Sequence, residues 1–305
     1  MTIKSQTELA SSRSNNIHMK KYMSLVLFAH SIFALPFAII GFFLAVHTTN
    51  YQFEWKLFLL MLLCMVSARN AAMAFNRYLD RDIDALNPRT AVRDIPAGKI
   101  SPTNALVFTV VNCVLFMTAT YFINPLCLAL SPVALFVVLF YSYMKRISPL
   151  CHLVLGLGLG LAPVGAYLAV TGSFSIVPVF FGLSVLTWVS GFDIIYALQD
   201  EAFDRDNGLN SIPANFGAKK ALRISELLHL FSFVFIILPV WFIELGIFYY
   251  LGVIFYALLL IFQHRLVNPP DLSRVNREFM TTNGVASVVF ALFFLLDVVF
   301  EHWRF

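Results

Sequence analysis

Long uninterrupted stretches of apolar residues are the feature that most constrains what this chain can fold into. Each runs for about 20 residues, the length that an α-helix needs to cross the hydrocarbon core of a bilayer. Of the 305 residues, 59% are hydrophobic and 12% are charged, whereas a soluble domain carries roughly 25% charged residues. The sequence therefore predicts an all-α integral membrane protein and excludes a soluble globular domain.

Nine candidate membrane-spanning helices can be placed on the sequence. Their ranges are 22–47, 56–79, 103–123, 125–144, 150–171, 177–199, 221–243, 246–264 and 283–301. Asn124 and Pro125 leave so short a connection that the third and fourth spans are expected to form a tight hairpin. The predicted organisation is a polar cytoplasmic tail over residues 1–21, followed by a single nine-helix domain over residues 22–305.

Basic residues are distributed unevenly between the two sides of these spans. Of the 21 Lys and Arg residues, 18 lie before the first span or at the connections that follow even-numbered spans, including the span ends next to those connections. Only Lys56 and Arg304 fall on the opposite side, and Arg69 lies inside the second span. Because cytoplasmic loops are enriched in Lys and Arg, we expect a cytoplasmic N-terminus and a C-terminus outside. The same rule accounts for the net charge of +4, so no nucleic-acid partner is expected.

An acidic motif follows the second span. Asn76, Asp80 and Asp84 recur every four residues, so they share one face if the helix continues through them. Like charges at this spacing destabilise a bare helix, which favours a cation between the carboxylates. Magnesium takes oxygen ligands and typically uses one or two carboxylates together with substrate phosphates. The motif therefore predicts a magnesium site for a diphosphate.

A second acidic motif follows the sixth span and repeats this arrangement. Tyr196, Asp200 and Asp204 again recur every four residues, and each aspartate follows its counterpart by 120 positions. Both motifs are followed by Ile-Pro-Ala, at residues 95–97 and 212–214. The repeat predicts that the two carboxylate pairs face each other. The alternative interpretation is a pair of ordinary solvated loops beside the membrane.

Three segments together resemble the signatures of the UbiA-type membrane prenyltransferases. They are the first motif over 76–84 with Asn-Pro-Arg-Thr at 87–90, the second motif over 196–204, and Tyr-Ser-Tyr-Met-Lys-Arg at 141–146. The resemblance covers nearly the whole chain. It is nearest to the 4-hydroxybenzoate polyprenyltransferases and to similar enzymes that act on 1,4-dihydroxy-6-naphthoate. It implies nine helices around a central cavity that opens sideways to lipid.

The resemblance also implies an activity, a cofactor and a location. The expected reaction is Mg²⁺-dependent transfer of a polyprenyl group from polyprenyl diphosphate to the ring of an aromatic acid. The favoured acceptor is 4-hydroxybenzoate in ubiquinone biosynthesis, and the alternative is 1,4-dihydroxy-6-naphthoate in menaquinone biosynthesis. The expected location is the bacterial inner membrane, with the site facing the cytoplasm. Carried over to this sequence, the residues that would hold magnesium and diphosphate are Asn76, Asp80, Asp84, Asp200 and Asp204.

Basic residues beside the motifs are candidate ligands of the diphosphate. Arg77, Lys145 and Arg146 could donate to phosphate oxygens, and guanidinium groups can do so in bidentate fashion. We expect Lys145 to take part in catalysis with the four aspartates. The alternative for Lys145 and Arg146 is that they only anchor the end of the fourth span.

Two charged residues within predicted spans lie close to the acidic motifs. Arg69 precedes Asn76 by seven residues, and Asp193 precedes Asp200 by seven. Charges inside a membrane are costly and normally face a cavity or a partner. Either the two form a buried pair, or Arg69 binds the acceptor carboxylate in a site shared with Asp193 and Tyr196. Such charges would also suit a transporter, but the acidic motifs at the membrane edge favour an enzyme.

Overall fold

The computed structural model describes residues 33–49, 51–267 and 277–301, and within these ranges it contains helices and no β-strand. Among the described residues, eight helices are long and apolar enough to cross a membrane. They are α3 (Trp55–Leu79), α5 (Pro102–Ile123), α6 (Pro125–Met144), α7 (Cys151–Thr171), α8 (Ile176–Ala197), α11 (Ala218–Ile237), α12 (Ile247–Leu266) and α13 (Arg277–Glu301). They correspond to eight of the nine predicted spans.

The predicted first span, 22–47, is represented by the shorter apolar helix α2 (Leu35–Thr48). Residues 22–32 lie outside the described ranges, as does the predicted tail over residues 1–21. Pro36 lies in the first turn of α2, where its missing N–H removes no intrahelical hydrogen bond.

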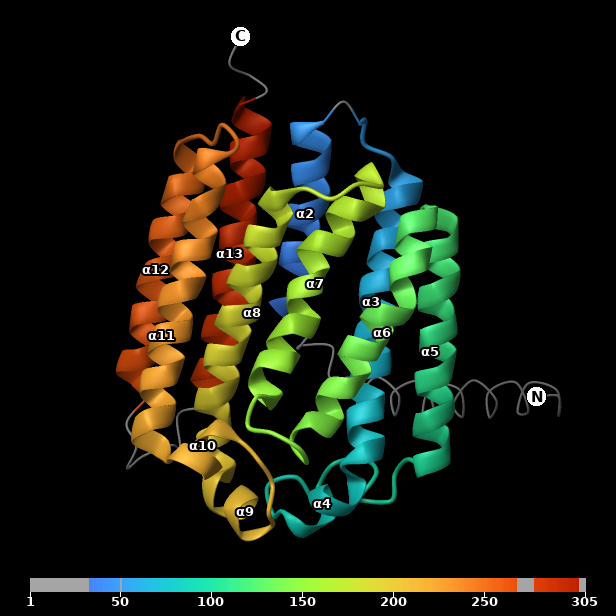
Figure 1. Cartoon of the computed structure of the whole chain (residues 1–305), viewed down its shortest axis with the longest axis vertical. Helices are drawn as coiled ribbons and strands as arrows, with labels where there is room; N and C mark the ends of the chain where they lie inside the picture. Colours follow the sequence, from blue (N-terminus) through green and yellow to red (C-terminus); the bar gives the residue numbers. More distant parts are fainter. Residues whose placement is uncertain (1–32, 50, 268–276, 302–305) are drawn as a thin grey trace, which may run out of the picture.

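The long helices stand side by side in one bundle (Figure 1). The turn at Asn124 and Pro125 joins α5 and α6 in the expected hairpin. Large apolar side chains such as Val107, Val111 and Val114 of α5 face outward and are exposed. An apolar outer surface of this kind is what lipid tails solvate, and it agrees with the composition of the sequence.

Small residues bring α7 and α8 into close contact. A methyl group added at Gly156 would lie 2.3 Å from the Leu186 carbonyl oxygen, and one at Gly160 would lie 2.6 Å from the Gly182 carbonyl oxygen. Neither distance leaves room for a Cβ atom. Interfaces of small residues allow backbones of membrane helices to approach closely, and here they hold together the two helices that carry one wall of the cavity described below.

Short polar helices gather at one end of the bundle. These are α4 (Arg81–Leu86), the 3₁₀ turn η2 (Leu198–Asp200), α9 (Glu201–Asp206) and α10 (Ile212–Phe216). Figure 1 shows them at the end opposite the C-terminal end of α13. We call this group the cap.

The structure corrects the expectation that a continuous helix runs through each acidic motif. Helix α3 ends at Leu79, and Asp80, whose φ is −90° and ψ is 3°, separates it from α4. The second motif is likewise divided among α8, η2 and α9. Each break turns the chain across the end of the bundle. The carboxylates of one motif therefore approach a common space from two elements instead of forming one stripe.

Candidate active site

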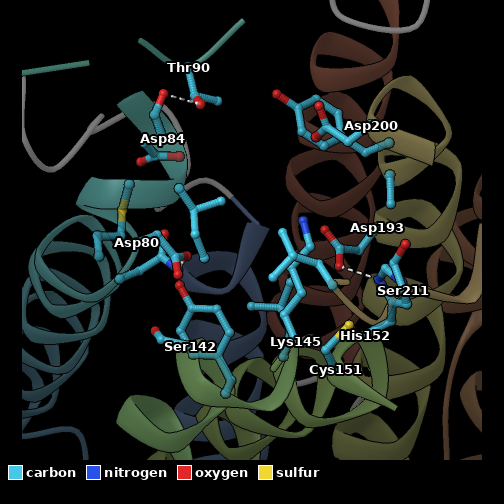
Figure 2. A pocket seen from close by; sticks show the side chains of 18 of the residues that line it. Asp80, Asp84, Thr90, Ser142, Lys145, Cys151, His152, Asp193, Asp200 and Ser211 are labelled. Carbon is cyan, nitrogen blue, oxygen red and sulfur yellow. Dashed lines mark hydrogen bonds and ion pairs between the residues drawn. The ribbon is translucent and has the colours of Figure 1, made fainter. Parts of the chain in front are cut away.

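A cavity of about 450 Å³ lies between the cap and the adjoining ends of α3, α6, α7 and α8. Ten of the eleven predicted site residues line it: Arg69, Asn76, Arg77, Asp80, Asp84, Lys145, Arg146, Asp193, Tyr196 and Asp200. In Figure 2, Asp80 and Asp84 lie on one side, and Asp193 and Asp200 lie on the other. Both carboxylates of the first motif thus share one cavity with Asp200 of the second motif, whereas the repeat predicted that both carboxylates of each motif would meet there.

Both aspartates of the first motif are held by arginines. Arg146 Nη1 lies 2.8 Å from Asp80 Oδ1, and Asn76 Nδ2 donates to Asp80 Oδ2 at 2.9 Å. Burial raises the pKa of Asp80 above its ordinary value, although Arg146 acts in the opposite direction. Arg93 Nη1 lies 2.6 Å from Asp84 Oδ1. The other oxygen of Asp84 is buried and has no hydrogen-bond partner among the described residues.

Arg89 connects the loop after the first motif to the second motif. Its guanidinium bonds both oxygens of Asp200, with Nε 2.9 Å from Oδ1, and donates from Nη1 to Tyr196 Oη at 3.0 Å. Asn87 adds a third bond to the same carboxylate, at 3.0 Å. Burial alone would lower the pKa of Arg89, but the bonds to Asp200 outweigh it and raise that pKa.

Asp204 is the one predicted site residue that does not line the cavity. Its side chain is fully buried, at 0% exposure, and Lys145 Nζ lies 2.7 Å from its Oδ1. Lys145 itself does line the cavity. An unpaired buried carboxylate is strongly destabilising, so Lys145 provides the charged partner that the buried Asp204 requires.

Each of the four motif aspartates is therefore paired with its own Lys or Arg. Sequence reasoning identified Lys145 and Arg146, but it assigned no role to Arg89 or Arg93. Arg89 belongs to the Asn-Pro-Arg-Thr segment that carried the resemblance, so a signal for it was present. Arg93 had no such signal, because it was counted only as one of the basic residues of a cytoplasmic loop.

The deeper wall of the cavity carries Arg69 from α3 and Asp193 from α8. Asp193 Oδ2 lies 2.7 Å from Nδ1 of His152 on α7. Asp193 thus has a partner without Arg69. His152 was not among the site residues predicted from the sequence. Nothing local marks this residue, since its partner is 41 positions away.

The residues that line the cavity fit a magnesium site in which the substrate supplies some of the ligands. Within the described ranges, no three His, Cys, Asp or Glu side chains form a ready-made metal site. Magnesium usually takes only one or two carboxylates and fills its remaining positions with phosphates and water. Asp80, Asp84 and Asp200 line one cavity, and the buried, unpartnered oxygen of Asp84 is a candidate ligand.

Comparison with known sequences gives a consistent family match. The chain matches the model of the UbiA prenyltransferase family over residues 34–295. A protein of Tolumonas auensis, named 4-hydroxybenzoate octaprenyltransferase, is 30% identical over 73% of this chain and 78% of its own. A protein of the same name from Aeromonas hydrophila is 31% identical over 73% of this chain and 77% of its own.

Solved structures show the same fold. The apo structure of a UbiA homolog from Aeropyrum pernix K1 has a TM-score of 0.79 and 34% identity, covering 88% of this chain and 98% of that one. A UbiA homolog from Archaeoglobus fulgidus bound to DMAPP and Mg²⁺ has a TM-score of 0.71 and 18% identity, covering 92% of this chain and 99% of that one. At that identity the second likeness concerns the fold alone.

Proposed function

Because this chain belongs to the UbiA prenyltransferase family, we propose that it transfers a polyprenyl group from polyprenyl diphosphate to a ring carbon of 4-hydroxybenzoate. The observation that carries the proposal is that a single cavity has two ends lined by different kinds of charged group. Ion-paired carboxylates from both acidic motifs lie at its cap end, and Arg69 and Asp193 lie within the bundle. The names of the bacterial relatives support 4-hydroxybenzoate as the acceptor.

The cap end of the cavity suits the diphosphate. Breaking the allylic C–O bond leaves a delocalised carbocation on the prenyl group and places negative charge on the leaving diphosphate. Mg²⁺ bound by Asp80, Asp84 and Asp200 would act as a Lewis acid for that charge. The A. fulgidus homolog, which has the same fold, was solved with DMAPP and Mg²⁺, so a bundle of this kind can hold a prenyl diphosphate together with the cation.

The paired basic residues suit the same ligand. Arg89, Arg93 and Arg146 line the cavity while they hold the carboxylates. Guanidinium groups bind phosphate and carboxylate with the same forked geometry. When the substrate enters, these donors can bond phosphate oxygens while the carboxylates bind the cation. The ion pairs therefore keep both sets of groups ordered and charge-balanced before the substrate arrives.

The deeper half suits an aromatic acid. Arg69 lies two helical turns from Asn76, about 10 Å further from the cap along α3. Its guanidinium would bind the carboxylate of 4-hydroxybenzoate and so direct the ring toward the diphosphate. Asp193 and Tyr196 line the opposite wall of the same space.

Apolar side chains complete the wall of the cavity and protect the carbocation. They are Met73, Leu155, Leu159, Val189 and Phe192. Water that reached the prenyl cation would react with it before the aromatic ring could attack. The apolar wall excludes water from this part of the cavity.

We also infer the orientation of the bundle. Basic residues crowd the end that carries the cap, which the preference of Lys and Arg for cytoplasmic loops places in the cytoplasm. With the first span at 22–47, nine spans would place the C-terminus outside. The bacterial relatives support an inner-membrane location. Alkaline phosphatase fused to the C-terminus should therefore be active. If that fusion is inactive while a reporter that works only in the cytoplasm is active at the same position, the orientation is the reverse.

The decisive experiment uses the detergent-purified protein with Mg²⁺ and a polyprenyl diphosphate. 4-Hydroxybenzoate and 1,4-dihydroxy-6-naphthoate are offered in separate reactions, and mass spectrometry detects the prenylated acid. We expect prenylated 4-hydroxybenzoate, and no product with EDTA or in Asp80→Ala. A product from the naphthoate alone would reassign the acceptor. No product from either acceptor, in protein that still binds the diphosphate, would overturn the aromatic-acid assignment. Activity in detergent also excludes a transporter, which needs a sealed compartment.

A further inference from the structure

We propose that Asp193 is the base that removes the ring proton of the acceptor, and that His152 is the positioning residue that holds its carboxylate toward the cavity. This inference rests on the proposed function, because it concerns the step that completes prenylation.

Asp193 differs from the other carboxylates that line the cavity. Asp80, Asp84 and Asp200 each have at least one oxygen occupied by a guanidinium. The partner of Asp193 is an imidazole instead. Asp193 also lies in the deeper half of the cavity, where the acceptor is proposed to bind. It is therefore the cavity carboxylate that is placed to act as a base.

The geometry leaves one oxygen of Asp193 free for this task. Its Oδ2 is occupied by His152 at 2.7 Å, and no hydrogen bond to Oδ1 is found among the described residues. The Asp193 side chain is 27% exposed, whereas that of His152 is 3% exposed. Both residues line the cavity, but the Asp193 carboxylate is the more accessible of the two. In Figure 2, the dashed line joins Asp193 to His152 at the wall of the cavity.

The protonation of His152 follows from its second contact. The backbone N–H of Ile212 lies 3.3 Å from His152 Nε2. A backbone N–H can only donate, so Nε2 accepts and the ring proton resides on Nδ1, from which it bonds Asp193. Ile212 begins α10 in the cap, so His152 also ties the base to the cap.

The position of Asp193 along α8 agrees with a role on the acceptor. It lies on α8, within the bundle, whereas Asp200 belongs to η2 in the cap. A ring whose carboxylate is bound by Arg69 would occupy the same deeper half of the cavity as Asp193.

The step balances without another reactant. The prenyl C–O bond breaks and its electron pair leaves with the diphosphate, while the ring carbon ortho to the phenol forms the new C–C bond. The resulting ring cation loses its proton from that carbon to Asp193 Oδ1. Aromaticity returns, and Asp193 becomes a neutral carboxylic acid that later releases the proton to water.

The test is a deuterium isotope effect on turnover, measured with 4-hydroxybenzoate that carries deuterium at both ring carbons ortho to the phenol. In the unaltered enzyme, proton loss follows a slower C–O cleavage, so we expect no isotope effect. In Asp193→Asn, kcat should fall by about 10²-fold or more, as for loss of a general base, and an isotope effect should appear. KM for the prenyl diphosphate should change little.

The His152 variants separate positioning from simple stability. His152→Leu removes the donor to Asp193 and should show the isotope effect with a smaller loss of kcat. His152→Asn places an amide N–H near the position of Nδ1 and should recover most of the activity. His229→Asn is the matched control, because it removes a buried imidazole, bonded to His264 at 2.8 Å, that does not line the cavity. It should turn over without an isotope effect.

Two results would overturn the inference while leaving the proposed function intact. One is an Asp193→Asn enzyme that binds both substrates and retains its kcat. The other is a large loss of kcat in Asp193→Asn without any isotope effect, which would assign Asp193 to binding or to the phenol instead. Absence of prenylated product in the unaltered enzyme would overturn the proposed function itself, so the two failures are distinguishable.

Discussion

Arg89 bonds both carboxylate oxygens of Asp200, a residue 111 positions away. This contact fastens the loop after the first acidic motif to the second motif, across the cavity. The two halves of the repeat are thereby joined at the point where the diphosphate is proposed to bind. Both the stability of the cap and the binding of the substrate should depend on it.

Arg89→Lys should reduce kcat/KM for the prenyl diphosphate by about tenfold or more. A lysine provides a point charge and cannot bond both oxygens of Asp200 together with Tyr196. Steady-state kinetics with a varied diphosphate concentration would measure the loss. Arg205→Lys is the matched control, because Arg205 forms only an exposed pair with Glu201, and such pairs contribute little. Equal kinetics for the two variants would contradict the role of Arg89.

Lys145→Met should destabilise the protein, because it leaves the fully buried Asp204 carboxylate without its partner. Breaking a buried pair by removing one member typically costs about 3–5 kcal/mol. The double variant Lys145→Met/Asp204→Asn removes both charges and should recover much of this stability, but not the activity. Thermal unfolding in detergent measures the first quantity, and product formation measures the second. A double variant as unstable as the single one would show that the pair is not the cause.

Arg69→Leu should raise KM for 4-hydroxybenzoate far more than KM for the prenyl diphosphate. The expected reason is loss of the guanidinium that binds the acceptor carboxylate. Arg69→Lys keeps a positive charge and should retain part of the affinity. Isothermal titration or steady-state kinetics with each substrate varied in turn would separate the effects. If both KM values rise equally, Arg69 supports the fold of the cavity and does not select the acceptor.

Gly156→Ala should lower the unfolding temperature, because its Cβ atom would lie 2.3 Å from the Leu186 carbonyl oxygen and would force α7 away from α8. Gly165→Ala in the same helix is the matched control, since no atom lies within 4 Å of the added methyl group. That second change should be neutral, or should stabilise the helix by up to about 1 kcal/mol. Similar unfolding temperatures for both variants would exclude close packing as the role of Gly156.

The features of this protein that depend on residues close together in the sequence, or on a regular repeat of them, were predictable from the sequence. Hydrophobic length defined the spans, and the predicted span 125–144 agrees with α6, Pro125–Met144. The four-residue spacing in each motif identified the aspartates, and the offset of 120 residues between the motifs predicted that they meet. Both kinds of signal are local or repeat regularly, so they do not require knowledge of the fold.

Only the tertiary structure decided which side chains pair. Helix α3 ends at Leu79, and Asp84 therefore belongs to α4, a break that the regular spacing of the motif did not reveal. Arg89 meets Asp200, and His152 meets Asp193, because separate helices converge on one cavity. A charged residue in a loop has many possible partners at similar sequence separations, and the packing of the helices selects one. The sequence by itself therefore determined the membrane bundle and the acidic groups, whereas the fold decided which cation each carboxylate meets and which carboxylate is left with an imidazole.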